Sequence, residues 1–306
     1  MKKTVIIPFL MLLVLVISAC GNNSEKTATA EEEQAETFTY ESENGPIEVP
    51  ADPQRVVVLA AFNAGSVMAL DVNLVGVDSW AKMNERYAPY IEDAEEVTDE
   101  SLEKIIELDP DLIIAAPTSN NLDKLGEIAP TVTYTYGELD YLSQHVEIGK
   151  LLNKEEEAQA WVDDFKERAQ AAGVEVKEKI GEDATVTVME NFDKQLYVFG
   201  DNWGRGTEIL YQEMKLEMPE KVKEMALNEG YYALSVEVLP EYAGDYMIVS
   251  SDGVDTAYQE TETYKNIPAV ANERVFTANA SEFYYNDPIT LDFQLDFFTE
   301  SFLGSN

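Results

Sequence analysis

The residues best suited to hold a small ligand lie in a short glycine-flanked segment that contains Trp203 and Arg205. The segment follows a predicted strand, Gln195 to Phe199, and precedes a predicted helix, Thr207 to Met214. Side chains at the carboxyl end of a strand in an α/β sheet tend to point into a ligand cleft. An aromatic ring supplies contact area, and one guanidinium can donate to several oxygens at once. The alternative is a core role for Trp203 and a surface ion pair for Arg205.

Further aromatic residues stand at corresponding places along the chain. Tyr284 and Tyr285 precede the last predicted helix, and adjacent residues of an extended segment face opposite ways. We therefore expect only Tyr284 to reach the cleft. In the first half, Trp80, Thr118, Tyr134 and Tyr136 follow or end predicted strands. Tyr134 and Tyr136 would share one face of a strand, so both should line the cleft or both should pack in the core.

Several kinds of chemistry are poorly supported by the residue inventory. His145 is the only histidine and Cys20 the only cysteine, which argues against Ser-His-Asp and Cys-His catalysis. Zinc sites usually draw on several His or Cys ligands, and no acidic loop of the EF-hand kind is present. We expect a protein that is not an enzyme, with no direct metal ligands and no resident cofactor.

The chain is extremely acidic, with 21 basic and 59 acidic residues and a net charge of −38. Nucleic acid and bare anionic membranes are therefore poor partners. Dense surface carboxylates also suit life at high salt or high pH, and the sequence does not separate these two explanations. A strongly anionic ligand would have to approach against the field of the whole protein.

The N-terminus predicts export and a lipid anchor. Lys2 and Lys3 precede an apolar run from Val5 to Ile17 that is too short to span a bilayer. The run ends in Ile17-Ser18-Ala19-Cys20, an arrangement at which a lipoprotein signal peptide is cut and Cys20 is lipidated. We assign residues 1–19 to the signal and 20–37 to a flexible tether on the outer face of the cell membrane. A free thiol behind a different cleavage site is the alternative for Cys20.

Strands alternate with helices on both sides of a long central helix. The N-terminal lobe, residues 38–153, has predicted strands at Arg55 to Leu59, Leu74 to Val77, Asp111 to Ala116 and Thr131 to Tyr136, with helices at Gly65 to Leu70 and Ser101 to Leu108. The C-terminal lobe, residues 182–306, has predicted strands at Thr185 to Met189, Gln195 to Phe199, Tyr246 to Ser250 and Val275 to Ala278, and a last helix at Leu291 to Leu303. This order indicates α/β lobes.

The central helix covers Glu155 to Ile180, within a linking segment at residues 154–181. Its apolar residues recur at steps of three and four, and ~26 residues at 1.5 Å each give roughly 39 Å. Gly173 is expected to end or bend it early. The prediction is two Rossmann-like lobes joined by one long helix, with a ligand cleft between them. A stiff link favours a largely preformed pocket.

Two further motifs give a family resemblance. Pro53-Gln54-Arg55-Val56-Val57-Val58-Leu59 and the run from Leu102 to Ile114, followed by the long helix, resemble the helix-linked substrate-binding proteins of iron-siderophore and vitamin B12 ABC importers. The resemblance covers nearly the whole chain after the tether. It implies that the protein carries a ligand to an ABC importer permease dimer. A structural adhesin would explain the anchor but not the two lobes.

A narrower resemblance concerns the run from Tyr197 to Glu208, which is similar to the ferric hydroxamate-binding lipoproteins of Bacillus and Staphylococcus relatives. It implies that Tyr197, Trp203 and Arg205 line the C-terminal side of the pocket. A ferric tris-hydroxamate of the ferrioxamine or ferrichrome type has a neutral core, which suits aromatic walls and one arginine. Catecholate or citrate siderophores, haem and corrinoids are the alternative ligands. The anionic siderophores would favour a basic cluster, and haem an axial His or Tyr.

Two glutamates carry the partner hypothesis, since the superfamily presents one acidic residue from each lobe to arginine pockets of the permease. Glu103, in Ser101-Leu102-Glu103, and Glu237, in Leu234-Ser235-Val236-Glu237, match those positions. Two ion pairs with the permease, one from each lobe, would fix the orientation in which a monomeric binding protein docks.

Overall fold

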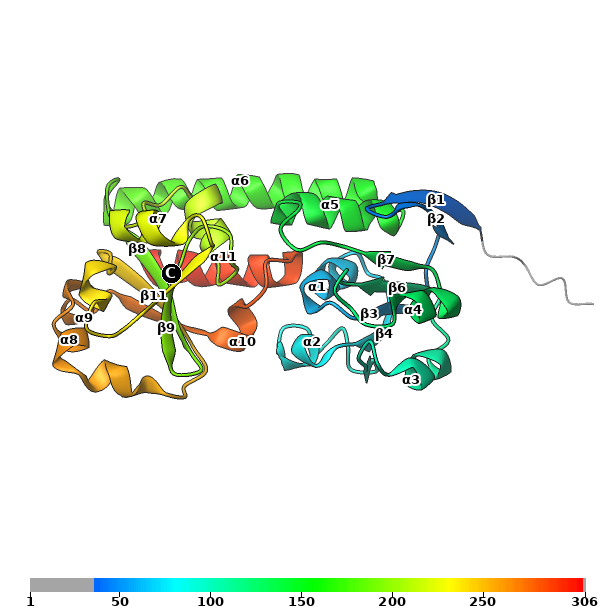
Figure 1. The fold of residues 1–306 in the computed structure, drawn as a ribbon. Coiled ribbons are helices and arrows are strands. Elements are labelled where there is room, and N and C mark those ends of the chain that lie inside the picture. Colours follow the sequence, from blue (N-terminus) through cyan, green and yellow to red (C-terminus); the bar gives the residue numbers. More distant parts are fainter. Residues whose placement is uncertain (1–35, 305–306) are drawn as a thin grey trace, which may run out of the picture. The chain divides into compact units, whose positions relative to one another are not determined.

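The computed structural model describes residues 36–304, which form two α/β lobes linked by α6 (Glu155–Ile180) (Figure 1). The predicted signal peptide, the lipidation site Cys20 and nearly all of the predicted tether lie outside the described residues. None of the helices between residues 36 and 304 has both the length and the apolar character that crossing a membrane requires.

The N-terminal lobe is built on a parallel five-stranded sheet with the order β5-β4-β3-β6-β7. Its centre is β3 (Val56–Val58), an apolar strand that is buried on both faces as its sequence predicts. Val56 and Val58 belong to one core cluster and Val57 to another. The other strands are β4 (Leu74–Val77), β5 (Glu95–Glu96), β6 (Leu112–Ala115) and β7 (Thr131–Thr133).

Helices cover this sheet, and a hairpin precedes it. The hairpin pairs β1 (Thr37–Ser42) with β2 (Gly45–Pro50) in antiparallel fashion. The helices are α1 (Ala61–Ala69), α2 (Ser79–Met83), α3 (Leu102–Glu107), α4 (Leu122–Ile128) and α5 (Tyr141–Leu151). Two predictions differ here: β7 ends at Thr133, three residues before the predicted end at Tyr136, and α1 begins at Ala61, four residues before the predicted start at Gly65.

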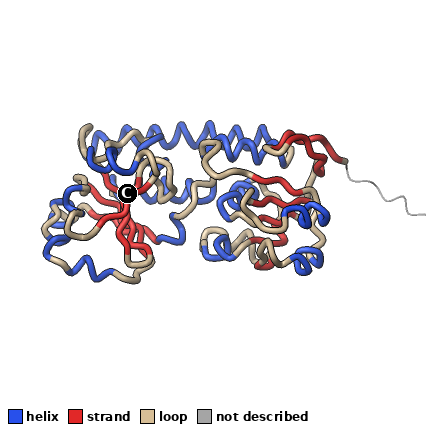
Figure 2. The backbone as a smooth tube through the Cα atoms, viewed as in Figure 1, coloured by secondary structure: helices blue, strands red, loops and turns tan. Residues whose placement is uncertain are grey.

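The C-terminal lobe contains a mixed sheet with the order β10-β9-β8-β11-β12. The strands β8 (Val186–Phe192), β11 (Tyr246–Ser251) and β12 (Val275–Asn279) run parallel. The strand β9 (Gln195–Phe199) forms an antiparallel hairpin with β8, and β10 (Tyr231–Leu234) extends the sheet beyond β9. Figure 2 shows the two five-stranded sheets in separate lobes and the β1–β2 hairpin apart from both of them.

The helical elements of this lobe are mostly short. They are η1 (Glu208–Glu213), α7 (Glu220–Ala226), η2 (Leu239–Glu241), η3 (Thr256–Glu260), α8 (Glu262–Lys265), α9 (Pro268–Ala271), α10 (Ala280–Phe283) and α11 (Pro288–Leu303). The predicted helix Thr207 to Met214 is π-helical over Glu208–Glu213. The last predicted helix begins three residues earlier than expected, at Pro288, because the Asp287 carboxylate accepts the backbone N–H groups of Ile289 and Thr290.

The linking helix α6 spans Glu155–Ile180, as predicted, and packs against α5, α11 and η1. Gly173 neither ends nor bends it. A Cβ at this position would lie 2.5 Å from the carbonyl oxygen of Met214, so glycine allows the C-terminal lobe to approach α6 closely. The last helix, α11, contacts both α6 and α1 and so packs against both lobes (Figure 1). The lobes are therefore tied by more than the single covalent crossing.

His145 of α5 lies in the interface with α6 and provides a test of this packing. The residue is only 1% exposed, its ring packs edge-on against Trp161 at 5.3 Å, and neither ring nitrogen has a hydrogen-bond partner among the described residues. Burial lowers the pKa of His145 from 6.5 to about 4.

Because the His145 imidazole is protonated more readily in the unfolded chain than in the folded one, its burial does not reduce the free energy of unfolding above about pH 6.5. The free energy of unfolding then falls as the pH is lowered from about 6.5 toward about 4. The loss attributable to His145 should approach about 3 kcal/mol. Urea unfolding of the wild type and of His145→Phe at a series of pH values measures it as the difference between the two proteins, which cancels the contribution of the many carboxylates. A difference that stays constant with pH would contradict the interpretation.

Candidate functional site

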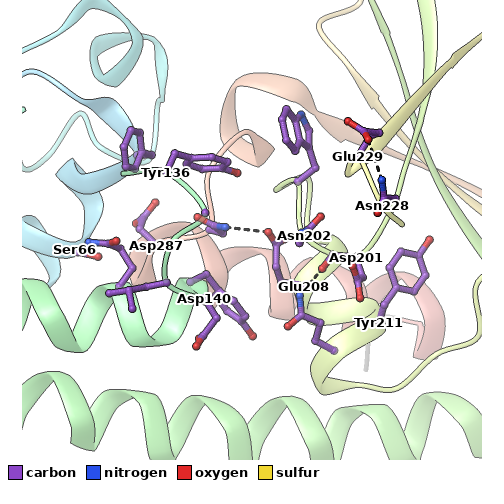
Figure 3. A pocket seen from close by; sticks show the side chains of 18 of the residues that line it. Ser66, Tyr136, Asp140, Asp201, Asn202, Glu208, Tyr211, Asn228, Glu229 and Asp287 are labelled. Atoms are coloured by element: carbon purple, nitrogen blue, oxygen red, sulfur yellow. Dashed lines mark hydrogen bonds between the residues drawn. The ribbon is translucent and has the colours of Figure 1, made fainter. Parts of the chain in front are cut away.

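Two cavities lie between the lobes. The first, which we call the aromatic cavity, measures about 430 Å³. Aromatic and small apolar side chains line most of it, and Arg205 and Asp78 supply charge. The second, which we call the acidic cavity, measures about 700 Å³ and is shown in Figure 3. Phe62 lines both cavities. Both volumes fall within the usual range for small-molecule sites.

The N-terminal lobe contributes to the aromatic cavity through the carboxyl ends of its parallel strands. Phe62 follows β3, Asp78 and Trp80 follow β4, and Ala116 follows β6. This is the edge at which α/β sheets hold ligands. Asp78 also caps α2, and its carboxylate accepts the backbone N–H groups of Ala61 and Ala81. Burial raises the pKa of Asp78.

The C-terminal wall depends on a turn of left-handed backbone. Gly204, Arg205 and Gly206 have φ angles of 68°, 58° and 78°. A Cβ on Gly204 would lie 2.4 Å from the carbonyl oxygen of Tyr284, and the Arg205 N–H donates to the carbonyl oxygen of Phe283 at 2.7 Å. Gly204 therefore lets the turn close onto the segment that carries Tyr284, and Gly206 leaves room for the Phe298 ring. Arg205, between them, lines the aromatic cavity.

Arg205 forms a largely buried ion pair rather than the surface pair considered as the alternative. Its Nε donates to Glu190 Oε2 at 2.8 Å, and the two side chains are 16% and 1% exposed. The guanidinium lies 4.9 Å from the ring centroids of both Phe199 and Tyr284. Nη1 donates to the Trp203 carbonyl and Nη2 to Glu190. Of its five N–H groups, two have no partner among the described residues and remain for a ligand.

Both adjacent tyrosines line the aromatic cavity, so the prediction that only one faces the cleft is wrong. The reason is local: α10 ends immediately before Tyr284, which keeps a helical φ and ψ, so the segment is not extended. Tyr284 packs edge-on against Trp80 with ring centroids 6.2 Å apart. Tyr285 is 9% exposed, and its hydroxyl has no hydrogen-bond partner among the described residues. Burial, together with the charge of Asp78, raises the pKa of Tyr285, so its hydroxyl stays protonated and can donate.

Tyr134 and Tyr136 do not share an environment, contrary to prediction, because β7 ends at Thr133. Tyr134 is 2% exposed and packs in the core, with its hydroxyl 3.1 Å from that of Tyr40. Tyr136 is 50% exposed and lines the acidic cavity. Its ring lies edge-on to Trp203, 6.0 Å away across the cleft. Thr118 is exposed and is not among the residues that line either cavity.

Trp203 lines the acidic cavity and is not among the residues that line the aromatic cavity. Tyr197 is not among the residues that line either cavity. It lies one layer behind, because its ring contacts Tyr231 at 5.9 Å and Tyr231 contacts Trp203 at 5.0 Å. Tyr197 therefore supports the wall in which Trp203 stands.

The carboxylates of the acidic cavity are largely engaged in holding the structure together. Glu208 is buried and accepts hydrogen bonds from the Gly204 N–H and from the Asn286 side chain. Asp140 and Asp287 cap α5 and α11. Burial raises the pKa of both Glu208 and Asp287. Within residues 36–304, no three His, Cys, Asp or Glu side chains are grouped so as to hold a metal ion.

The two predicted docking glutamates lie one on each lobe, and both are exposed. Glu103 is in the first turn of α3, and the Glu237 side chain precedes η2. A hydrogen bond from Ser235 lowers the pKa of Glu237. Both side chains are thus accessible to a partner.

Sequence reasoning missed Phe62, Asp78, Phe192 and Glu190. A signal for the first two was present, since both follow predicted strands of the N-terminal lobe at their carboxyl ends. Phe192, at the turn of the hairpin, and Glu190, beneath Arg205, depend on the register between β8 and β9.

Comparisons with known proteins agree with this architecture. A family model described as periplasmic binding protein matches residues 56–282. The chain is 38% identical to the iron(3+)-hydroxamate-binding protein FhuD of Bacillus subtilis, covering 96% of this chain and 95% of that protein. It is 34% identical to the iron(3+)-hydroxamate-binding protein YxeB of the same organism, covering 98% and 97%. It is similar to the solved structure of FhuD2 from Staphylococcus aureus with bound ferrioxamine B, with a TM-score of 0.78, 34% identity, and coverage of 82% and 98%.

The buried ion pair gives a test of the C-terminal wall. In Glu190→Gln, the charged partner of Arg205 is lost while the shape of the side chain is kept, so stability should fall by about 2 kcal/mol. Glu229→Gln, an exposed residue of the acidic cavity, is the matched control and should change stability by less than about 0.5 kcal/mol. Urea unfolding monitored by circular dichroism compares them. Equal effects of the two substitutions would show that the pair contributes no more than a surface charge.

Proposed function

The chain belongs to the periplasmic binding protein family, and from this premise we propose that it captures a ferric hydroxamate siderophore outside the cell and delivers it to an ABC importer for iron uptake. The observation that carries the proposal is the composition of the aromatic cavity. Its one basic side chain, Arg205, is already paired with Glu190, and five of the ten other lining residues are aromatic.

The charge of the cavity favours a neutral complex. Three singly charged hydroxamates offset Fe³⁺, which leaves oxygen acceptors on an uncharged core. Glu190 compensates Arg205, and Asp78 adds a carboxylate to the opposite wall. A trianionic ferric catecholate would meet no surplus of positive charge here. The spare N–H groups of Arg205 can donate to hydroxamate oxygens.

The names of the relatives support the same ligand class. FhuD and YxeB of Bacillus subtilis are named for iron(3+)-hydroxamate, and FhuD2 of Staphylococcus aureus was solved with ferrioxamine B. We propose a ligand of the ferrioxamine or ferrichrome type, with the iron arriving as part of the siderophore and no resident cofactor. Catalysis is not part of the proposal, since His145 lies in the helix interface and not in a cavity.

Delivery of the ligand requires that the protein stay near the membrane and bind a permease there. We propose that Cys20 carries a lipid that holds the monomer at the outer face of the membrane, and that the permease dimer recognises the two lobes. Exposed Glu103 and Glu237, one per lobe, provide two separated charges for arginine side chains of such a partner.

Ligand class is tested by quenching of tryptophan fluorescence in the purified domain, titrated with ferrioxamine B, ferrichrome and a ferric catecholate. Saturable quenching is expected with the hydroxamates and not with the catecholate. Trp203→Leu and Arg205→Ala should each weaken binding at least about tenfold, because the first removes contact area and the second a hydrogen-bond donor.

Trp161→Phe is the matched control for this titration, since Trp161 packs against His145 and Phe165 and is not among the residues that line either cavity. Its affinity should equal that of the wild type. Binding of the catecholate, haem or cobalamin in place of the hydroxamates would retain a transport role and overturn the proposed ligand.

Docking and anchoring are tested by iron uptake in cells that express each variant as their only copy. Glu103→Ala combined with Glu237→Ala should reduce hydroxamate-dependent uptake at least about tenfold through lost charge pairs, with the affinity for the ligand unchanged. Glu167→Ala, an exposed residue of α6, is the control and should support normal uptake. Cys20→Ser should release the protein into the medium. Normal uptake by the double variant would refute the docking role.

A further inference from the structure

The segment that carries the two cavity tyrosines belongs to the C-terminal lobe by sequence but packs into the other lobe. It connects α10 with α11, after the last strand of the C-terminal sheet. Tyr285 is nonetheless a member of the core cluster of the N-terminal lobe, and Tyr284 and Ile289 pack against that cluster. The wall formed by the two tyrosines is therefore fixed by residues of the N-terminal lobe.

Two consecutive residues of the N-terminal lobe, in the turn after α2, make this attachment. Tyr87 is fully buried, and its ring stacks on that of Tyr285 with centroids 5.6 Å apart and planes 17° apart. Its hydroxyl donates to the Asp287 carboxylate, which itself caps the start of α11. Tyr87 thus holds both the ring of one cavity tyrosine and the residue at which the following helix begins.

Arg86 holds the same segment from the outside. Its Nε donates to Glu282 Oε1 at 2.5 Å, and its guanidinium lies 3.8 Å from the centroid of the Phe293 ring. Glu282 is nearly buried, with a side chain 9% exposed. The two contacts lie on either side of Tyr284 and Tyr285, so the segment is attached before, at and after the residues that line the cavity.

Close packing leaves this segment little freedom to move. A Cβ on Gly65 of α1 would lie 1.9 Å from Asp287 Oδ1, so the α1 backbone closes directly on the carboxylate. On the cavity side, Tyr284 packs against Trp80 and the Arg205 guanidinium. The contacts at Arg86 and Tyr87 are the ones that substitution can loosen without altering a side chain that lines the cavity.

We propose that Arg86 and Tyr87 are positioning residues for ligand capture. They hold Tyr284 and Tyr285 in the ligand-competent geometry before the ligand arrives, which removes the cost of ordering this wall during binding. The proposal rests on the proposed function, because it concerns the same cavity. It assigns a role to two residues that are not among those lining either cavity.

Association kinetics separate positioning from a general contribution to stability. If loosening leaves the wall in place only about a tenth of the time, the apparent affinity falls about tenfold. That loss should appear in the association rate, because the complex, once formed, still holds the tyrosines in place. We therefore expect Arg86→Gln/Tyr87→Phe to bind ferrioxamine B about tenfold more slowly, with an unchanged dissociation rate. Tyr87→Phe alone, which keeps the ring stacking, should show a smaller effect and serves if the double variant folds poorly.

Arg168→Gln is the matched control. Arg168 of α6 donates to Asp292 of α11 at 2.6 Å, so this substitution removes an ion pair to the helix that contains Phe293 without altering a contact of Tyr284 or Tyr285. It should leave the association rate unchanged. Stopped-flow fluorescence at a temperature at which every variant is fully folded gives the rates.

Hydrogen exchange of residues 280–289 without ligand supplies a second readout. Exchange should quicken in the Arg86 and Tyr87 variants and not in Arg168→Gln. Unchanged exchange in the double variant, or faster exchange with an association rate within twofold of the wild type, would overturn the proposal. If the wild type fails to bind any ferric hydroxamate, the proposed function falls, and the exchange experiment still decides whether the two residues hold the tyrosine wall.

Discussion

The ion pair between Arg205 and Glu190 is the interaction on which the cleft depends. A carboxylate that is 1% exposed would be unstable without a charged partner, and Arg205 supplies one from the turn at Gly204 to Gly206. The left-handed backbone of that turn is what brings the guanidinium between Glu190, Phe199 and Tyr284. Arg205 therefore links β8, the glycine turn and the segment between α10 and α11 that carries Tyr284. The ion pair also removes most of the positive charge that an anionic ligand would need.

Rigidity follows from how the chain returns across the cleft. The covalent crossing is α6, but α11 lies against both α6 and α1, and the segment before it packs into the N-terminal core. Lobes held at three places have few ways to move independently. The site is thus closer to a preformed pocket than to a cleft that closes by movement of the lobes. The affinity for the ligand therefore depends on how well the pocket walls are held in place before binding.

The charge of the surface differs from the charge of the cleft. The surface is strongly acidic, which favours solubility and repels anions. Within the cleft, most carboxylates are committed to helix caps or hydrogen bonds, as Asp78, Asp287 and Glu208 illustrate. The aromatic cavity therefore presents rings and a few spare donors rather than a strong field. A neutral complex rich in oxygen acceptors is compatible with both the acidic surface and the aromatic cavity.

Both ends of the linking helix could be predicted from the sequence, because the pattern of apolar residues spaced by three and four over Glu155–Ile180 is a local property of the chain. Six of the eight predicted strands agree with the structure to within one residue at each end, whereas β1, β2, β5 and β10 were not predicted. The sequence also placed Trp203 and Arg205 at the cleft, since glycines after a strand mark an exposed turn. Tertiary structure alone decided where β7 stops, and hence that Tyr136 faces the cleft while Tyr134 is buried. It also decided that Glu190 lies under Arg205 and that Tyr285 joins the core of the other lobe. These outcomes depend on strand register and on contacts between residues up to about two hundred positions apart, such as Tyr87 and Asp287, which no local pattern encodes.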